Sequence, residues 1–185
     1  SYKSNGIMQV LNVKIKADST MTIRVPILQE VNVFVLFRAL GVHSDHDIIN
    51  MIINDENDND MSDILRISLD NCKNENHQKI QTSEEAYDFL INKLKVIRKY
   101  TESNIDTKIM QKKMHLLHLL KTSFIPHIEG GFKEKAYYLG YMINKLLKVF
   151  LKRVDVDDRD SYVNKRIDLP GDLLMELFKQ RFKIM

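Results

Sequence analysis

The residues best suited to chemistry lie in one charged segment near the C-terminus. Its four aspartates are Asp155, Asp157, Asp158 and Asp160. Carboxylate oxygens are the usual protein ligands of Mg²⁺ and Ca²⁺. A calcium loop that starts at Asp155 would need Gly at its sixth position and Glu at its twelfth, where this chain has Asp160 and Arg166. The pattern therefore favours a network in which Arg153, Arg159, Lys165 and Arg166 neutralise the acids, and a Ca²⁺-binding module is the lesser alternative.

Other reactive side chains do not form a recognised site. His115 and His118 stand three residues apart, but no acid accompanies them as it does in the zinc protease motif. The single Cys72 excludes a disulfide or a cysteine metal cluster within this chain and fits a reducing compartment. Lysines and arginines of residues 91–121 could contact phosphates, although a solvated helix face is the favoured interpretation. The tyrosines of residues 137–141 are interpreted as core and interface packing.

Charge is distributed unevenly along the 185 residues. Residues 42–90 carry 12 acidic and 3 basic side chains, residues 91–121 carry 8 basic and 2 acidic ones, and the net charge of the whole chain is only +3. No apolar run approaches the roughly 18 residues that a membrane span requires, and no signal peptide is evident at the N-terminus. We therefore expect no membrane association and no secretion, and a chain of one domain or one domain with an appendage.

The N-terminal third predicts strands and then a helix. Alternating apolar residues over 7–17 and 21–27, with a turn at Asp18-Ser19, predict a β-hairpin. Residues 31–41 combine β-branched alternation with a helical apolar stripe. We favour a helix capped by Asn32, ended by Gly41 and with Arg38 off the apolar stripe.

Helical patterns dominate the remainder. Ser44 and Ser62 are predicted N-caps, and Thr82 with Glu85 forms a capping-box signature. The predicted helices cover residues 45–53, 62–69, 82–99, 105–121 and 133–152, the last being the longest and most buried, and an amphipathic helix follows from residue 173. The fold class is therefore α+β: a mostly helical lobe packed on a small antiparallel sheet or hairpin.

Three blocks, in order, resemble the second-largest, β-type subunit of multisubunit DNA-directed RNA polymerases. They are Phe-Val-Leu-Phe-Arg-Ala-Leu-Gly-Val at 34–42, Phe-Ile-Pro-His-Ile at 124–128 with the helical residues 135–147, and Asp-Asp-Arg-Asp-Ser-Tyr-Val-Asn-Lys-Arg at 157–166. The blocks resemble the eukaryotic, archaeal and large-DNA-virus branch more than the bacterial one. Residues 161–163 depart from the usual His-(Phe/Leu)-Gly, which leaves the backbone shape of that block open.

The resemblance implies a fragment of a larger subunit. Residues 1–153 would form the lobe domain, and residues 154–185 a connector that begins the return into the protrusion. The chain would be a wall of the DNA cleft and a docking surface for initiation factors in transcription. The catalytic residues and Mg²⁺ of the nucleotidyltransferase would lie outside it, and no cofactor is expected in this fragment. A free-standing helical protein-interaction module is the alternative.

Residue by residue, the resemblance implies four nucleic-acid contacts: Arg159, Asp160, Lys165 and Arg166. Asp160 matches an acid that in bacterial relatives accepts from a guanine edge, and Lys165 matches a neighbouring arginine. The implied partners are the other polymerase subunits, including the largest, together with DNA and initiation factors. The implied location is the nucleus for a cellular eukaryotic source, and the host cytoplasm or virion for a large DNA virus.

Overall fold

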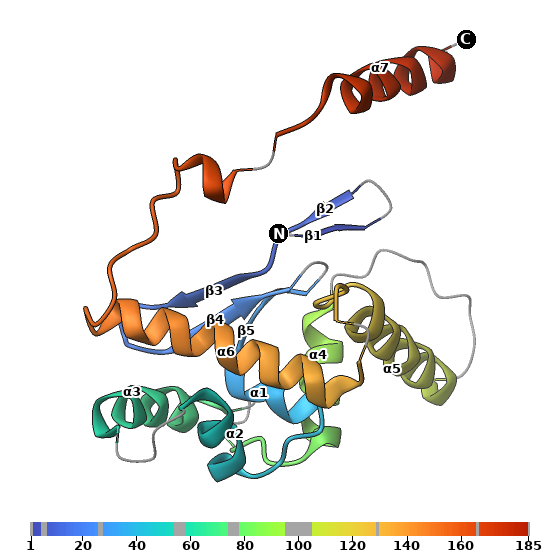
Figure 1. Ribbon diagram of the computed structural model, residues 1–185. Coiled ribbons are helices and arrows are strands. Elements are labelled where there is room, and N and C mark those ends of the chain that lie inside the picture. The colour runs from blue at the N-terminus through green and yellow to red at the C-terminus, as the bar shows by residue number, and fades with distance from the viewer. Residues whose placement is uncertain are drawn as a thin grey trace. The chain divides into compact units, whose positions relative to one another are not determined.

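The computed structural model describes residues 2–4, 7–25, 28–53, 58–73, 78–94, 105–128, 130–165 and 167–184 (Figure 1). The chain divides into two compact units, Ser1–Lys148 and Val149–Met185. None of the helices in these ranges combines the length and apolar character that crossing a bilayer requires.

The strands form two small antiparallel sheets. β1 (Tyr2–Ser4) pairs with β2 (Ile7–Gln9), and a three-stranded sheet has the order β3 (Asn12–Ile15), β4 (Met21–Arg24), β5 (Glu30–Asn32). The predicted hairpin is confirmed for β3 and β4, whose turn is closed by two hydrogen bonds that Thr20 donates to Asp18 Oδ1. Residues 7–9 instead pair backward with 2–4, so one continuous strand over 7–17 was wrong. Residues 26–27, which include the end of the second predicted strand, lie outside the described ranges.

Helices make up most of the molecule, and with the small sheets they confirm the predicted α+β class. They are α1 (Val33–Ala39), α2 (Asp45–Ile52), α3 (Asn59–Asp70), α4 (Ser83–Lys93), α5 (Ile105–Thr122), α6 (Phe132–Phe150), the short 3-10 helix η1 (Tyr162–Asn164) and α7 (Pro170–Ile184).

Residues 31–41, whose pattern suited both a strand and a helix, contain the end of a strand followed by a helix. Val31 belongs to β5, and Asn32 then caps α1 by accepting the N–H of Phe34 at 2.9 Å. Gly41, with φ at +92°, follows the helix end as predicted. α1 packs against α4, α3 and the sheet, and all of its residues are buried. In Figure 1 it lies behind α6.

Arg38 was expected off the apolar stripe of this helix, yet its side chain is only 3% exposed. Its guanidinium forms an ion pair with Asp45 at the start of α2 and donates to Cys72 Sγ at 3.6 Å. These partners offset the cost of burying the charge, while the Nε of Arg38 is buried without a hydrogen-bond partner. Cys72 is a buried core residue, and this burial raises the pKa of its thiol.

Several helix boundaries differ from the sequence prediction, and the start of α3 and the end of α4 are the most informative. α3 begins at Asn59 with Asp58 as its N-cap, because the Asp58 carboxylate accepts the N–H of Met61, so Ser62 is not the cap. α4 begins at the predicted capping box, which is confirmed, but it ends at Lys93. Leu94 turns away from the helix and forms a bridge with Leu28. Residues 95–104 lie outside the described ranges.

The capping box of α4 gives the chain a local dependence on pH. Glu85 Oε2 accepts from the N–H groups of Gln81 at 2.8 Å and Thr82 at 3.3 Å, which lowers the pKa of the Glu85 carboxyl. This stabilisation is complete above the ordinary pKa of the carboxyl and is lost as pH falls through the lowered value. Glu85→Gln is therefore expected to make stability fall less on acidification. Urea unfolding at neutral pH and at about pH 3 measures this difference.

Glu84→Gln is the matched control for that measurement. It removes the same charge from the same turn of α4 and leaves the Thr82–Glu85 hydrogen bonds in place. An equal loss of stability on acidification in the two variants would contradict the role given to Glu85.

α6 is fixed against its neighbours by polar contacts as well as by apolar ones. Gly140 lies so close to α2 that a Cβ there would be 2.4 Å from the carbonyl oxygen of Met51. Asn144 Nδ2 donates to Ile52 O at 2.8 Å. The buried ammonium of Lys135 donates to three carbonyls in the last turn of α5 and just after it, those of Leu120, Lys121 and Phe124, at 3.0, 2.7 and 2.7 Å. These contacts hold the last turn of α5, α6 and α2 together.

Candidate functional site

The candidate nucleic-acid segment of the second unit is organised around Asp158. Its carboxylate accepts the N–H of Asp160 at 2.9 Å, and its carbonyl accepts from Asn164 Nδ2 at 2.8 Å. Ser161 then caps η1, since its hydroxyl accepts the N–H of Val163 at 3.4 Å. Short polar side chains favour such local turns. The altered residues 161–163 therefore still form a defined turn, without the glycine of the usual motif.

This turn brings two of the four predicted residues together. Lys165 Nζ lies 3.6 Å from Asp160 Oδ1 and 5.9 Å from the centre of the Tyr162 ring. The side chains of Asp160 and Lys165 are 80% and 48% exposed, and Arg159 is also exposed. An exposed pair of this kind contributes little to stability. Arg166 lies outside the described residues, so its placement stays a prediction.

The chemistry open to this segment is hydrogen bonding and charge. Asp160 offers acceptor oxygens, while Lys165 and Arg159 offer donors and positive charge. The Asp160–Lys165 pair belongs to the ion-pair network predicted for the segment. No group of three or more His, Cys, Asp or Glu side chains that could hold a metal is present in the described ranges. His115 on α5 is half-buried and His118 is exposed.

Part of the basic surface predicted for residues 91–121 is also described. Lys93 Nζ lies 5.4 Å from the centre of the Phe89 ring, and Lys113 Nζ lies 5.6 Å from that of Tyr87. Both lysines are thus engaged with rings on α4. Lys95, Arg98 and Lys99 lie outside the described ranges.

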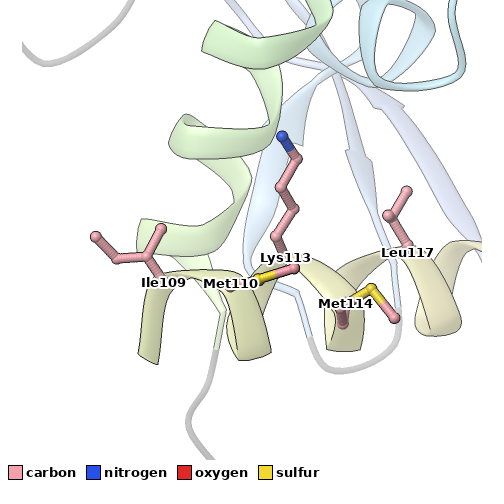
Figure 2. Close-up of a pocket in the computed structure, with 5 residues that line it drawn as sticks. All are labelled: Ile109, Met110, Lys113, Met114 and Leu117. Carbon is pink, nitrogen blue, oxygen red and sulfur yellow. The ribbon is translucent and has the colours of Figure 1, made fainter. Parts of the chain in front are cut away.

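An apolar hollow of about 480 Å³ runs along α5. Figure 2 shows its lining, which comes from one helix: Ile109, Met110, Lys113, Met114 and Leu117. Met110 and Met114 are 68% and 63% exposed. Methionine side chains adapt to irregular apolar partners. This hollow therefore offers an apolar contact surface with one charged group, the ammonium of Lys113.

Sequence reasoning missed the outward face of α6. Tyr137 and Tyr141 are each 52% exposed, so the core part of the predicted core and interface packing is wrong for these two residues, and the interface part stays a prediction. Their spacing of four residues places them on one face. The missed signal was the spacing of Ala136, Leu139 and Ile143, which are buried and form the inner face of this helix. Tyr137 and Tyr141 lie on a different face.

Comparison with known proteins defines the class. Residues 1–168, including the Asp158 turn, match the family model described as RNA polymerase Rpb2, domain 2. The chain belongs to this family of second-subunit domains, which confirms the predicted family.

Individual relatives come from the branches that the sequence favoured. The chain is 36% identical over 194 residues to DNA-directed RNA polymerase subunit 2 of Acanthamoeba polyphaga mimivirus, covering 97% of this chain and 16% of that protein. It is 36% identical over 190 residues to DNA-directed RNA polymerase II subunit RPB2 of Eremothecium gossypii, with 98% and 14% covered. It is 33% identical over 152 residues to DNA-directed RNA polymerase subunit Rpo2 of Saccharolobus solfataricus, with 80% and 12% covered. The chain spans less than a fifth of the length of these relatives.

Proposed function

We propose that this chain is a structural part of a DNA-directed RNA polymerase and serves transcription within the second-largest subunit. The observation that carries the proposal is the family match across residues 1–168. Residues 1–153 act as the lobe domain, and residues 154–185 as the connector that returns toward the protrusion. The chain forms one wall of the DNA cleft and a docking surface for initiation factors. The catalytic residues and Mg²⁺ of the polymerase lie in other parts of the enzyme.

The connector's exposed side chains support a role inside a larger assembly. α7 has no buried residue, although it carries a row of large apolar side chains. These are 51–69% exposed: Leu173, Leu174, Leu177, Phe178 and Phe182. Exposed apolar surface of this extent is typical of protein interfaces. The proposed partners are the other polymerase subunits, including the largest, and the location follows the source, nuclear for a cellular enzyme or host cytoplasm and virion for a viral one.

Mass spectrometry of the purified native complex tests the proposal directly. We expect peptides of this chain within a much larger polypeptide that purifies together with the largest polymerase subunit. Recovery of a free 21.7 kDa polypeptide without polymerase subunits would overturn the proposal. The exposed faces of α5 and α7 would then favour a free-standing helical interaction module.

The DNA-contacting part of the proposal predicts a salt-dependent effect. Lys165→Ala in the assembled polymerase, alone and with Arg166→Ala, is expected to shorten the lifetime of the open complex. Each lost phosphate contact should also reduce the slope of log affinity against log salt by about 1. Open-complex lifetimes measured over a series of salt concentrations provide the test.

Lys179→Ala is the control for this experiment because it removes one lysine from α7, outside the Asp158 turn. Unchanged lifetime and salt slope in the Lys165 and Arg166 variants would remove these residues from the DNA interface.

A further inference from the structure

The outward face of α6 carries a stripe of tyrosines flanked by lysines. Lys133, Tyr137, Tyr141, Lys145 and Lys148 recur at three- and four-residue spacing and therefore share one side of the helix. Tyr137 and Tyr141 are each 52% exposed, Lys133 and Lys145 are exposed, and Lys148 is half-buried. We call these five residues the α6 stripe.

The α6 stripe is presented on a firmly held helix. The opposite side of α6 is buried through Ala136, Leu139, Ile143 and Leu147. Near one end Lys135 binds three carbonyls of the α5 terminus, and Asn144 binds Ile52 O. A rigid platform lowers the ordering cost that a partner must meet on binding.

The charge of the α6 stripe selects an acidic partner. Lys133 and Lys145 are exposed and Lys148 is half-buried, whereas the Glu134 side chain lies over Gly130 and Gly131, with its Cγ 2.8 Å from the place of a Gly130 Cβ. Tyrosine hydroxyls and lysine ammoniums both donate hydrogen bonds. The stripe thus offers donors to carboxylates along its whole length, and ring edges to apolar side chains between them.

The arrangement of the rings argues against stacked nucleobases. Lys145 Nζ lies 5.2 Å from the centre of the Tyr141 ring, and the Tyr138 ring is tilted beside it at 6.2 Å. A base that stacks on Tyr141 would compete with the Lys145 ammonium for one face of that ring. The outward face of a helix is also convex, whereas single strands are usually held in a groove.

We propose that the α6 stripe docks an acidic, extended segment of a partner protein in which carboxylates alternate with apolar side chains. The proposal rests on the proposed function and deepens it, because it names the surface and the chemistry of one docking partner. From Lys133 to Lys148 a helix rises about 22 Å. About seven residues of extended chain span that distance.

Binding of a fluorescent peptide to the 185-residue chain tests the proposal. The probe has about ten residues, enough to span the stripe, with Asp and Glu alternating with Leu and Phe. Fluorescence anisotropy at physiological salt measures its affinity for the parent chain, for Tyr137→Ala/Tyr141→Ala and for Lys133→Glu/Lys145→Glu. We expect each double variant to weaken binding by about tenfold or more, as central interface residues do.

Lys179→Glu/Lys183→Glu on α7 is the charge-matched control, since it changes the net charge by the same amount and alters no residue of the α6 stripe. It should bind the peptide within about twofold of the parent chain, because the proposal places every contact with the peptide on the α6 stripe. Circular dichroism melting of each variant verifies that the exposed substitutions leave the fold intact.

Each result decides the proposal. If the stripe variants and the control weaken peptide binding equally, the effect is one of net charge and the proposal is overturned. Absence of peptide binding would overturn it as well. Tighter binding of oligothymidylate than of the peptide, lost in the tyrosine variant, would make the stripe a nucleic-acid surface instead.

Failure here is distinguishable from failure of the proposed function. Retention of initiation factors by assembled polymerase that carries Tyr137→Ala/Tyr141→Ala would leave the docking role in place while removing the α6 stripe from it. Absence of this chain from any polymerase complex would remove the proposed function itself.

Discussion

Replacing Gly140 with alanine is expected to lower the free energy of unfolding by about 2–3 kcal/mol. A Cβ at this position would lie 2.4 Å from the carbonyl oxygen and 3.0 Å from the carbonyl carbon of Met51. Both atoms belong to the backbone of α2, which cannot move aside as a flexible side chain can. α6 must therefore shift outward, which also strains the hydrogen bond from Asn144 to Ile52. Urea unfolding followed by circular dichroism measures the loss.

Gly171→Ala is the matched control for Gly140→Ala. Gly171 also lies in a helix, and a Cβ there meets nothing within 4 Å. Alanine is favoured over glycine in a helix by up to about 1 kcal/mol, so this variant should be as stable as the parent chain or more stable. Equal stability of the two alanine variants would show that α6 and α2 are not in close contact.

Lys135→Met is expected to cost about 3 kcal/mol or more. Methionine has a similar length and fills the same apolar space, so packing is largely retained. The variant nevertheless leaves the carbonyls of Leu120, Lys121 and Phe124 without the donor that they share. Unsatisfied buried acceptors each cost about 1–3 kcal/mol. Urea unfolding gives the total, and amide hydrogen exchange should show the last turn of α5 opening more readily.

Lys133→Met provides the comparison, because Lys133 lies on the same helix two residues earlier with an exposed side chain. Its stability should stay within about 0.5 kcal/mol of the parent chain. A Lys135→Met variant that is no less stable than Lys133→Met would mean that the α5 carbonyls find other donors.

Local signals in the sequence predicted local structure well. The capping box at Thr82 and Glu85, the cap at Ser44 and the turn at Asp18 involve residues two or three positions apart, so the chain near each of them decides the outcome. Helix ends that depend on distant partners were harder to predict. α4 ends at Lys93 because Leu94 bridges to Leu28, which lies far away in the sequence.

Buried charges were the main features that pattern reasoning could not find. The partners of Arg38 come from the start of α2 and from Cys72, and those of Lys135 are backbone carbonyls with no side-chain signal. Hydropathy alone assigns both side chains to the surface. For the candidate site, the pairing of Asp160 with Lys165 was foreseeable from their alternating charges. The assignment of that segment to nucleic acid came from the family resemblance, and it stays a prediction.

α7 lacks the support that keeps most helices folded. It has 15 residues, none of them buried. Starting a helix fixes several residues for the first hydrogen bond, so isolated helices of about this length are marginal in water. In proteins, such a helix is stabilised mainly by the packing of its apolar side against another surface. In the proposed assembly a partner covers this apolar side, so the helix–coil equilibrium of α7 is expected to differ between the isolated chain and the assembled polymerase.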